Sequence, residues 1–329
     1  MKKLLALLAV CAMMLCSLTA CSSSDGGNKD SAILKIGVLQ YMQHPSLTES
    51  YEGFVDGLKE AGYVDGENIK IDYQNASGED SNSHQICELF EGNNVDMVLA
   101  IATPAAQSAV NVFQDTDIPV LFTAVTDAEE AGLVVSNEAP GKNVTGTLDM
   151  PVIYDQISVI KEVLPEAKTL GILYTSSEPN SEIQAEEAKA AAQSLGMEVV
   201  IQTASSSNDI KQVVESVVGS VDAVYIPSDN AFANAMATVH ATAVENQLPV
   251  FAAVEAMIAE GAIATTAIDY YELGKQTAAQ AVRVLEGESA SNIAVETQEE
   301  CALVVNKTFA ESVGVVIPEE IVKKAAVVY

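Results

Sequence analysis

The sequence predicts an α/β protein of two doubly wound, Rossmann-like lobes joined by a hinge. Three observations lead to this fold class: short apolar runs alternate with amphipathic segments, the same order of segments occurs twice, and a helix and strands remain after the second copy. The 329 residues suffice for two domains of roughly 100–200 residues each. Hydrophobic residues make up 49% of the chain, which supplies two cores and excludes disorder as the global class.

The first copy of the pattern begins at Ile33, after which strands and helices are expected to alternate. Apolar runs bounded by turn residues and separated by helical patterns of about 10–15 residues are typical of parallel βαβ units with helices on both faces. The first helix is expected to end before Gly62, since glycine commonly follows a helix end. The expected strands are 33–39, 69–73, 97–102 and 120–123, and the expected helices are 47–61, 81–91 and 104–112.

The second copy repeats the first in order and in spacing. The same spacing separates Gly37 from Gly62 in the first copy and Gly171 from Gly196 in the second. Several correspondences in one order favour two lobes of one fold, and a single long doubly wound domain is the alternative. The other matching segments are 36–39 with 170–173, 95–98 with 221–224, and 119–122 with 249–251.

Elements remain beyond the second copy. They are a strand at 262–268, a helix at 271–285 and extended stretches at 293–295 and 301–306. A chain with such a remainder is expected to cross between the lobes more than once, which forms a hinge and a cleft. The sequence therefore assigns 33–148 plus 269–297 to lobe 1 and 149–268 plus 298–329 to lobe 2.

Residues 1–20 have the pattern of a secretory signal peptide, with a basic start followed by an apolar run. This run of about 15 residues is shorter than the roughly 20 needed for a membrane span. The signal ends in Leu-Thr-Ala-Cys, which resembles the bacterial lipobox, in which the cysteine is acylated. We expect Cys21 to carry a lipid such as palmitate, followed by a flexible tether over 21–32. An ordinary cleaved signal with an incidental cysteine is the alternative.

The charge of the chain excludes one class of partner. Sixteen basic residues against 46 acidic ones give a formal net charge of −30. Nucleic acid requires clusters of Lys and Arg, and Arg283 is the one arginine in the sequence. A strongly acidic surface keeps a protein soluble and unassociated, so we expect a monomer that is anchored outside the cytoplasm only through its lipid.

The sequence contains few signs of catalysis. It lacks the motifs of serine hydrolases, zinc proteases, P-loop proteins and dinucleotide-binding folds, so we expect no metal, no cofactor and no enzyme activity. Cys87 and Cys301 remain after the signal and Cys21, and we expect two unpaired, partly buried thiols, with one disulfide as the alternative. His44 follows the first strand, where it would line a pocket or lie on the surface.

The candidate binding residues are small polar groups that follow the predicted strands. Ligands of open α/β sheets bind beyond the carboxyl ends of the strands. Thr103 and Pro104 favour a helix start whose free N–H groups would bind a carboxylate without arginine. Acids at these strand ends would hold an ammonium group or, alternatively, cap the next helix. The candidates are Gln40, Tyr41, Thr103, Pro104, Thr123, Thr126, Asp127, Ser177, Glu178, Asp229, Asn230 and Asp269.

Six motifs in order make the chain similar to one family. The likeness spans about 34–325 and is specific for the family but not for the ligand. The chain resembles the substrate-binding lipoproteins of ABC importers, which include tryptophan- and tyrosine-type binding proteins. The motifs are Ala102–Gln107, Phe122–Asp127, Asn143–Gly146, Ser177–Ser181, Pro227–Asn230 and Ile268–Tyr271.

The resemblance implies a type I periplasmic-binding fold in which the chain crosses three times between lobes that close on a small molecule. It implies a solute receptor that delivers to an ABC permease and ATPase, with an amino acid as the expected ligand. An aromatic one is preferred, with Tyr41, Tyr270 or Phe232 available for stacking. Two other functions remain open: a surface-anchored hydrolase that uses cleft carboxylates, and a ligand sensor for a signalling partner.

Overall fold

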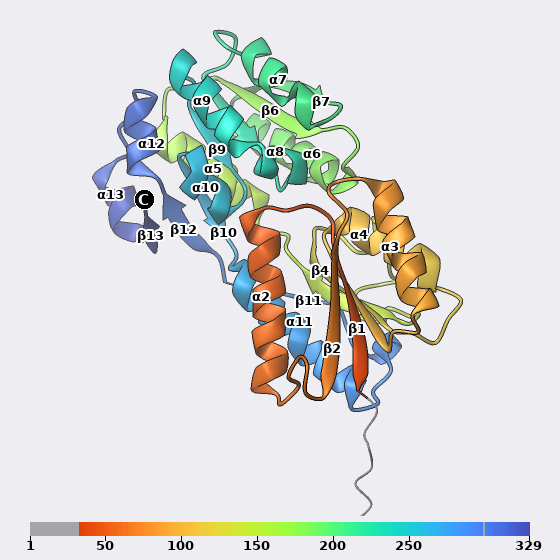
Figure 1. Ribbon diagram of the computed structural model, residues 1–329. Coiled ribbons are helices and arrows are strands. Elements are labelled where there is room, and N and C mark those ends of the chain that lie inside the picture. Colours follow the sequence, from red (N-terminus) through yellow and green to blue (C-terminus); the bar gives the residue numbers. More distant parts are fainter. Residues whose placement is uncertain (1–32, 299) are drawn as a thin grey trace, which may run out of the picture. The chain divides into compact units, whose positions relative to one another are not determined.

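Three β-sheets and the helices around them make up the part of the chain that the computed structural model describes, residues 33–298 and 300–329 (Figure 1). From Leu34 to Tyr329 this part is one compact unit. The expected signal, lipidated Cys21 and tether lie outside the described residues. Among the described residues, no helix is both long and apolar enough to cross a bilayer.

The strands and helices alternate along the chain in close agreement with the predicted order. The strands are β1 (Leu34–Gln40), β2 (Ile69–Asn75), β3 (Met97–Ile101), β4 (Val120–Val125), β5 (Val144–Leu148), β6 (Thr169–Thr175), β7 (Glu198–Ala204), β8 (Ala223–Ile226), β9 (Val250–Ala252), β10 (Ala264–Ala267), β11 (Glu296–Thr297), β12 (Ala302–Val305) and β13 (Val327–Val328). The helices are α2 (Pro45–Glu60), α3 (Asp80–Gly92), α4 (Thr103–Phe113), α5 (Ile153–Val163), α6 (Pro179–Ser194), α7 (Ile210–Ser216), α8 (Asn230–Asn234), α9 (Met236–Asn246), α10 (Glu255–Gly261), α11 (Tyr270–Leu285), α12 (Lys307–Ser312) and α13 (Glu319–Lys324), with short 3-10 turns at Ser207–Asp209 and Ala290–Asn292.

The first sheet has six parallel strands in the order β11-β5-β4-β3-β1-β2. Helices α2 and α11 pack together on one face, and α3 and α4 pack together on the other (Figure 1). Every residue of β3, β4 and β5 is buried. Cover on both faces explains why these strands are continuous apolar runs in the sequence.

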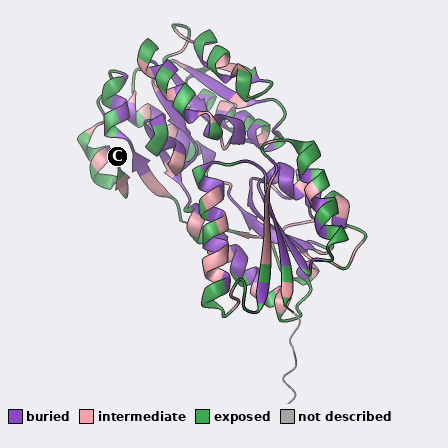
Figure 2. Ribbon diagram, viewed as in Figure 1, coloured by how far each residue is buried: buried purple, intermediate pink, exposed green. Residues whose placement is uncertain are grey.

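The second sheet confirms the internal repeat. Its four parallel strands have the order β7-β6-β8-β9, which matches β2-β1-β3-β4 in the first sheet. Both copies are therefore doubly wound, as predicted. Figure 2 shows the buried strands of both sheets and the exposed outer faces of the surrounding helices.

The end of the chain differs from the prediction. The predicted extended stretch 293–295 is not a strand, because its backbone bonds to a side chain of β5 and to a loop: Ile293 accepts a hydrogen bond from Thr145 Oγ1 (2.8 Å) and Val295 donates one to Asn137. Pairing with the first sheet begins only at β11. The stretch predicted at 301–306 contains β12, which forms a third sheet, antiparallel to β10 and parallel to β13.

The chain leaves or re-enters the first sheet three times. It leaves the first sheet after β5, returns with α11 and β11, and leaves again into β12. The lobe boundaries given above stay a prediction. Within the described residues Cys87 and Cys301 are unpaired, as expected; Cys87 is buried, but Cys301, on the link between β11 and β12, is exposed rather than partly buried.

Candidate ligand-binding site

Side chains from the carboxyl ends of both parallel sheets meet in one buried cavity. They follow β1, β4 and β5 of the first sheet and β6, β8 and β9 of the second, and one comes from the start of α11. The cavity measures about 20 Å³, enough for roughly one water-sized group. Its lining residues are His44, Leu47, Ala124, Thr126, Asp149, Asn180, Ser228, Asp229, Asn230, Ala233, Val254 and Tyr270.

Asp149 directly follows β5 and is a buried carboxylate in this lining. Tyr270 Oη donates a hydrogen bond of 2.6 Å to Oδ2, and Thr126 Oγ1 donates one of 3.4 Å to Oδ1. Burial raises the pKa of Asp149, and these two hydrogen bonds oppose the shift. Among the described residues, no lysine or arginine lines this cavity. The carboxylate is therefore placed to receive a cationic group.

His44 links the two parallel sheets through Asn230. Its Nε2 lies 3.0 Å from Asn230 Oδ1, and Asn230 Nδ2 donates to Glu178 Oε2. Burial lowers the pKa of His44 to about 4, so the imidazole is neutral near pH 7. His44 Nδ1 is buried and has no hydrogen-bond partner among the residues described.

The other two acids at this edge already have hydrogen-bond partners. Asp229 Oδ2 accepts from the Thr175 backbone N–H (2.6 Å), and Oδ1 accepts from Thr175 Oγ1 and from the Phe232 N–H (both 2.9 Å). Glu178 accepts from two backbone N–H groups at the start of α8. Burial raises the pKa of both carboxyls. Their hydrogen bonds hold loops of the second sheet, as the capping alternative expects.

The start of α4 lies beside this edge of the first sheet. Ala102, just before the helix, has φ 86°, and Ala124 at the neighbouring strand end has φ 55°. Left-handed backbone is unfavourable for residues with a Cβ and is typical of functional sites. Thr103 is 3% exposed, and its Oγ1 lacks a hydrogen-bond partner within the described part of the chain. First-turn N–H groups and this hydroxyl favour an anion.

The structure brings only some of the sequence-predicted residues to the cavity. Three line it, namely Thr126, Asp229 and Asn230. Six more are buried at the same strand ends without lining it, namely Gln40, Tyr41, Thr103, Pro104, Thr123 and Glu178.

Three predicted residues lie away from the cavity. Asp127 Oδ1 accepts from the backbone N–H groups of Glu129 and Glu130 and so holds its own loop. Asp269 is exposed and caps α11, and Ser177 is exposed. These positions follow strands, but their side chains serve local turns or face solvent.

Sequence reasoning missed two acceptors of the lining and left two residues undecided. Asp149 follows the strand 144–148, which the pattern did not single out, and Asn180 is the second residue of α6. A polar residue directly after an apolar run is the signal that identifies Asp149. His44, for which the sequence leaves a pocket or a surface position open, and Tyr270, which is predicted only as an available stacking residue, both line the cavity.

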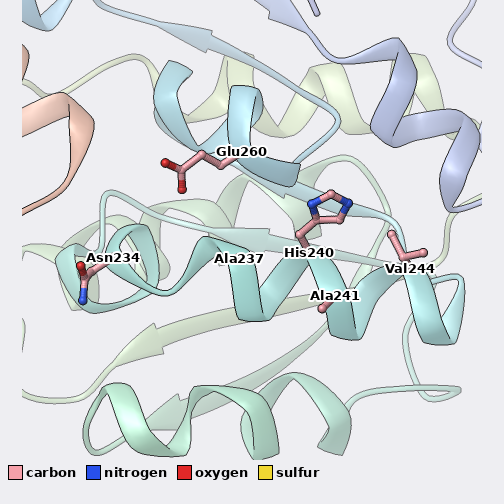
Figure 3. Close-up of a pocket in the computed structure, with 6 residues that line it drawn as sticks. All are labelled: Asn234, Ala237, His240, Ala241, Val244 and Glu260. Atoms are coloured by element: carbon pink, nitrogen blue, oxygen red, sulfur yellow. The ribbon is translucent and has the colours of Figure 1, made fainter.

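A larger hollow lies elsewhere, between α9 and α10 (Figure 3). It measures about 650 Å³ and is an open groove lined by both helices and by Asn234. The Glu260 carboxylate is directed away from the His240 ring (Figure 3), and that ring packs edge-on against Phe309 at 5.2 Å. Its polar groups do not converge, so the smaller buried cavity is the better candidate.

The described residues contain no group of three or more metal-ligating side chains that could hold an ion. The cavity offers carboxylate, amide, hydroxyl and imidazole groups from both parallel sheets. This combination suits recognition of a small polar molecule.

Comparisons with known proteins agree with this geometry. Residues 35–329 match the family described as "ABC transporter substrate binding protein". A tyrosine-binding protein of Clostridioides difficile is 39% identical over 314 residues, which cover 93% of this chain and 90% of that protein.

Two solved structures are similar at the same level of identity, 38%. One is a Streptococcus pneumoniae ABC domain in complex with L-Trp, with TM-score 0.87, covering 90% of this chain and 99% of that chain. The other is the ligand-free, open structure of a Clostridium difficile substrate-binding protein with adhesive properties, with TM-score 0.68 and the same coverage. At equal identity, the present structure superposes better on the L-Trp complex.

Proposed function

Because the chain belongs to the ABC transporter substrate-binding proteins, we propose that its solute is an aromatic amino acid, held between the two parallel sheets. Proteins of this family bind a solute outside the cytoplasm and work with a permease and an ATPase. The family consists of binding proteins rather than enzymes. The protein accordingly binds a small solute for import.

Asp149 is the observation that carries the proposal. It is 4% exposed, lines the cavity and has only hydroxyl partners, at 2.6 and 3.4 Å. A buried carboxylate without a cation gains most from a ligand that supplies one. The ammonium group of an amino acid would do so, while keeping the Tyr270 and Thr126 contacts.

The carboxylate of the ligand has a separate place at the start of α4. In this proposal the Thr103 hydroxyl and the free N–H groups of the first turn hold it. Support comes from the unpartnered, buried Thr103 Oγ1 and from Pro104, which favours a helix start. The single arginine, Arg283, is engaged with Glu288 at 2.8 Å on the surface, so another carboxylate-binding group is needed.

The aromatic side chain requires more room than the cavity offers. Its volume of about 20 Å³ accommodates a group of ammonium size, so the rest of the ligand must displace lining side chains. The better superposition on the L-Trp complex than on the open structure supports a closed arrangement here. We propose that lobe 1 (33–148 plus 269–297) and lobe 2 (149–268 plus 298–329) separate to admit the ligand.

Calorimetry and thermal shift with matched ligands test this function. L-Tyrosine and L-tryptophan should bind, whereas tyramine, which lacks the carboxylate, and 3-(4-hydroxyphenyl)propionate, which lacks the amine, should bind at least about 100-fold more weakly. Stabilisation by sugars or nucleosides, and by no amino acid, would contradict the ligand class while leaving the receptor function intact. Light scattering on the same samples checks the expected monomer.

A lipid anchor on Cys21 is part of the proposal and is supported by the sequence alone, since Cys21 lies outside the described residues. Cells fed labelled palmitate should incorporate label into the wild-type protein and not into Cys21→Ala. The matched control is Cys301→Ala, which removes an exposed thiol and should keep the label. Equal labelling of all three proteins would contradict the anchor.

A further inference from the structure

The hydrogen-bond chain from Glu178 through Asn230 fixes the tautomer of His44. Both carboxylate oxygens of Glu178 accept backbone N–H groups at the start of α8, so this carboxylate is the acceptor for Asn230 Nδ2. The amide of Asn230 then presents Oδ1 to His44 Nε2 at 3.0 Å. Since Oδ1 only accepts, Nε2 must carry the proton, and Nδ1 of the neutral ring holds a lone pair.

Other polar atoms of the cavity lining are hydrogen-bond acceptors, like His44 Nδ1. His44 Nδ1 and Asn180 Oδ1 are buried acceptors with no hydrogen-bond partner among the described residues. Asp149 contributes a carboxylate whose oxygens each accept one hydroxyl. All three residues line the same small cavity. Three acceptors around a space of this size match a group with three N–H donors.

We propose that His44 Nδ1 accepts a hydrogen bond from the ammonium group of the bound solute, and that Asn230 and Glu178 are positioning residues that keep His44 in the accepting tautomer. This inference rests on the proposed amino-acid ligand and deepens it, because it selects primary amines. N-methylation of the ligand removes one of the three donors. The His44–Asn230 contact also couples recognition of the solute to closure of the two lobes, since Asn230 follows β8 of the second sheet and His44 follows β1 of the first.

Two conservative variants of His44 separate the two ring nitrogens. In His44→Gln the side-chain amide replaces Nε2, so the contact with Asn230 is kept and the Nδ1 acceptor is lost. In His44→Asn the amide oxygen replaces Nδ1, so the acceptor is kept and the contact with Asn230 is lost. L-Tryptophan and L-tyrosine binding, measured by calorimetry, should weaken about tenfold or more in His44→Gln and clearly less in His44→Asn.

The ligand provides a second comparison. N-Methyl-L-tryptophan should bind the wild type more weakly than L-tryptophan. In His44→Gln the ratio of the two Kd values should be smaller, by about the same factor by which this variant weakens L-tryptophan binding. Equal losses in the two variants, or a greater loss in His44→Asn, would overturn the proposal and leave His44 as a contact between the sheets. Unfolding temperatures of the ligand-free variants check that each one folds.

The tautomer itself has a readout that is independent of ligand. Nitrogen NMR of protein labelled at its three histidines should show His44 with a protonated Nε2 and an unprotonated Nδ1, assigned by comparison with His44→Gln. Asn230→Ala should mix the tautomers and weaken L-tryptophan binding. Asn234→Ala, an exposed position of the same helix, should change neither. A protonated Nδ1 in the wild type would overturn the inference.

The failure of this inference is distinguishable from failure of the proposed function. If the wild type binds neither aromatic amino acid, the ligand class is wrong and the inference falls with it. If the wild type binds L-tryptophan and His44→Gln binds it equally well, the proposed function stands and the role of His44 is overturned.

Discussion

Tyr270 donates a hydrogen bond of 2.6 Å to Asp149, a residue 121 positions earlier in the chain. Asp149 stands where the chain leaves the six-stranded sheet, and Tyr270 stands where it returns with α11. The buried carboxylate proposed to bind the ligand is thus attached to two of the three chain crossings. Any movement of the sheets about these crossings therefore changes the contacts that the ligand experiences.

Replacing Asp149 by Asn should abolish recognition of the ammonium without harming the fold. The amide keeps the shape of the carboxylate but loses the charge, and a hydrogen bond to a charged group contributes about 1.5–3 kcal/mol. We expect the Kd for L-tryptophan to rise about 100-fold in calorimetry. The unfolding temperature without ligand should stay the same or increase, because a buried charge is removed.

Asp155→Asn is the matched control for this change. Asp155 is an exposed acid in the first turn of α5. The Asp155→Asn variant should therefore bind L-tryptophan as the wild type does. Wild-type affinity in Asp149→Asn would show that the ammonium is held elsewhere.

The affinity for L-tryptophan should fall in acid because of His44. Burial lowers the pKa of His44 from 6.5 to about 4, so the exposed imidazole of an open form binds protons that the closed form rejects. The contribution of His44 to the affinity for L-tryptophan is therefore fully present above pH 6.5 and is lost as the pH falls towards 4. Between pH 7.5 and pH 5 this loss is roughly 30-fold in Kd.

His44→Gln isolates this contribution. Asp149, Asp229 and Tyr270 line the same cavity and Glu178 lies beside it, and burial raises the pKa of each. Burial of Glu178 and Asp229 acts with the opposite sign as the pH falls, whereas the ligand ammonium favours the charged form of Asp149. These groups remain in the variant, and the ratio of wild-type to variant Kd should still rise on acidification. A pH-independent ratio would exclude titration of His44 on closure.

Much of the fold was predictable because its strands are buried on both faces. Met97–Ile101 has five buried residues in a row and so produces an uninterrupted apolar run. The third sheet was not predictable, because antiparallel pairing of β10 with β12 joins segments that are far apart in sequence. Ile293 is a residue type that favours strands, yet its carbonyl accepts a hydrogen bond from the Thr145 side-chain hydroxyl of β5 instead of pairing with the backbone of that strand.

The location of the site, at the carboxyl ends of the strands of two sheets, was predictable from the sequence. Most of the side chains that form it were not. Asp127, Asp149 and Asp229 each follow a strand, and the sequence does not distinguish them. Their partners do: Asp127 holds its own loop, Asp229 holds Thr175, and Asp149 contacts only hydroxyls. Tyr270, which supplies one of those hydroxyls, reaches Asp149 only through the folded chain.

The two described cysteines should differ sharply in reactivity. Cys301 is exposed, whereas Cys87 is fully buried and burial raises the pKa of its thiol to about 12. A maleimide reagent applied to the native protein should therefore label Cys301 and spare Cys87, and both should react in denaturant. Peptide mass mapping identifies the labelled sites. Protection of Cys301 in the native protein, reversed by a reductant, would instead reveal a disulfide.

The contact between α2 and α11 should set both stability and affinity. Gly53 of α2 lies against the backbone carbonyl of Tyr271, and Gly274 of α11 lies against that of Ser50, so neither position has room for a Cβ. Gly53→Ala should push the helices apart and lower the free energy of unfolding by about 3 kcal/mol in urea titrations. Gly92→Ala is the matched control, because Gly92 ends α3 with nothing within 4 Å of an added Cβ.

The same change should weaken ligand binding through the site. His44 immediately precedes α2 and Tyr270 begins α11, so separating the helices moves two lining residues relative to each other. Gly53→Ala should thus raise the Kd for L-tryptophan at temperatures where the protein is still folded, whereas Gly92→Ala should not. A destabilised variant with wild-type affinity would show that the helix pair supports the fold without positioning the site.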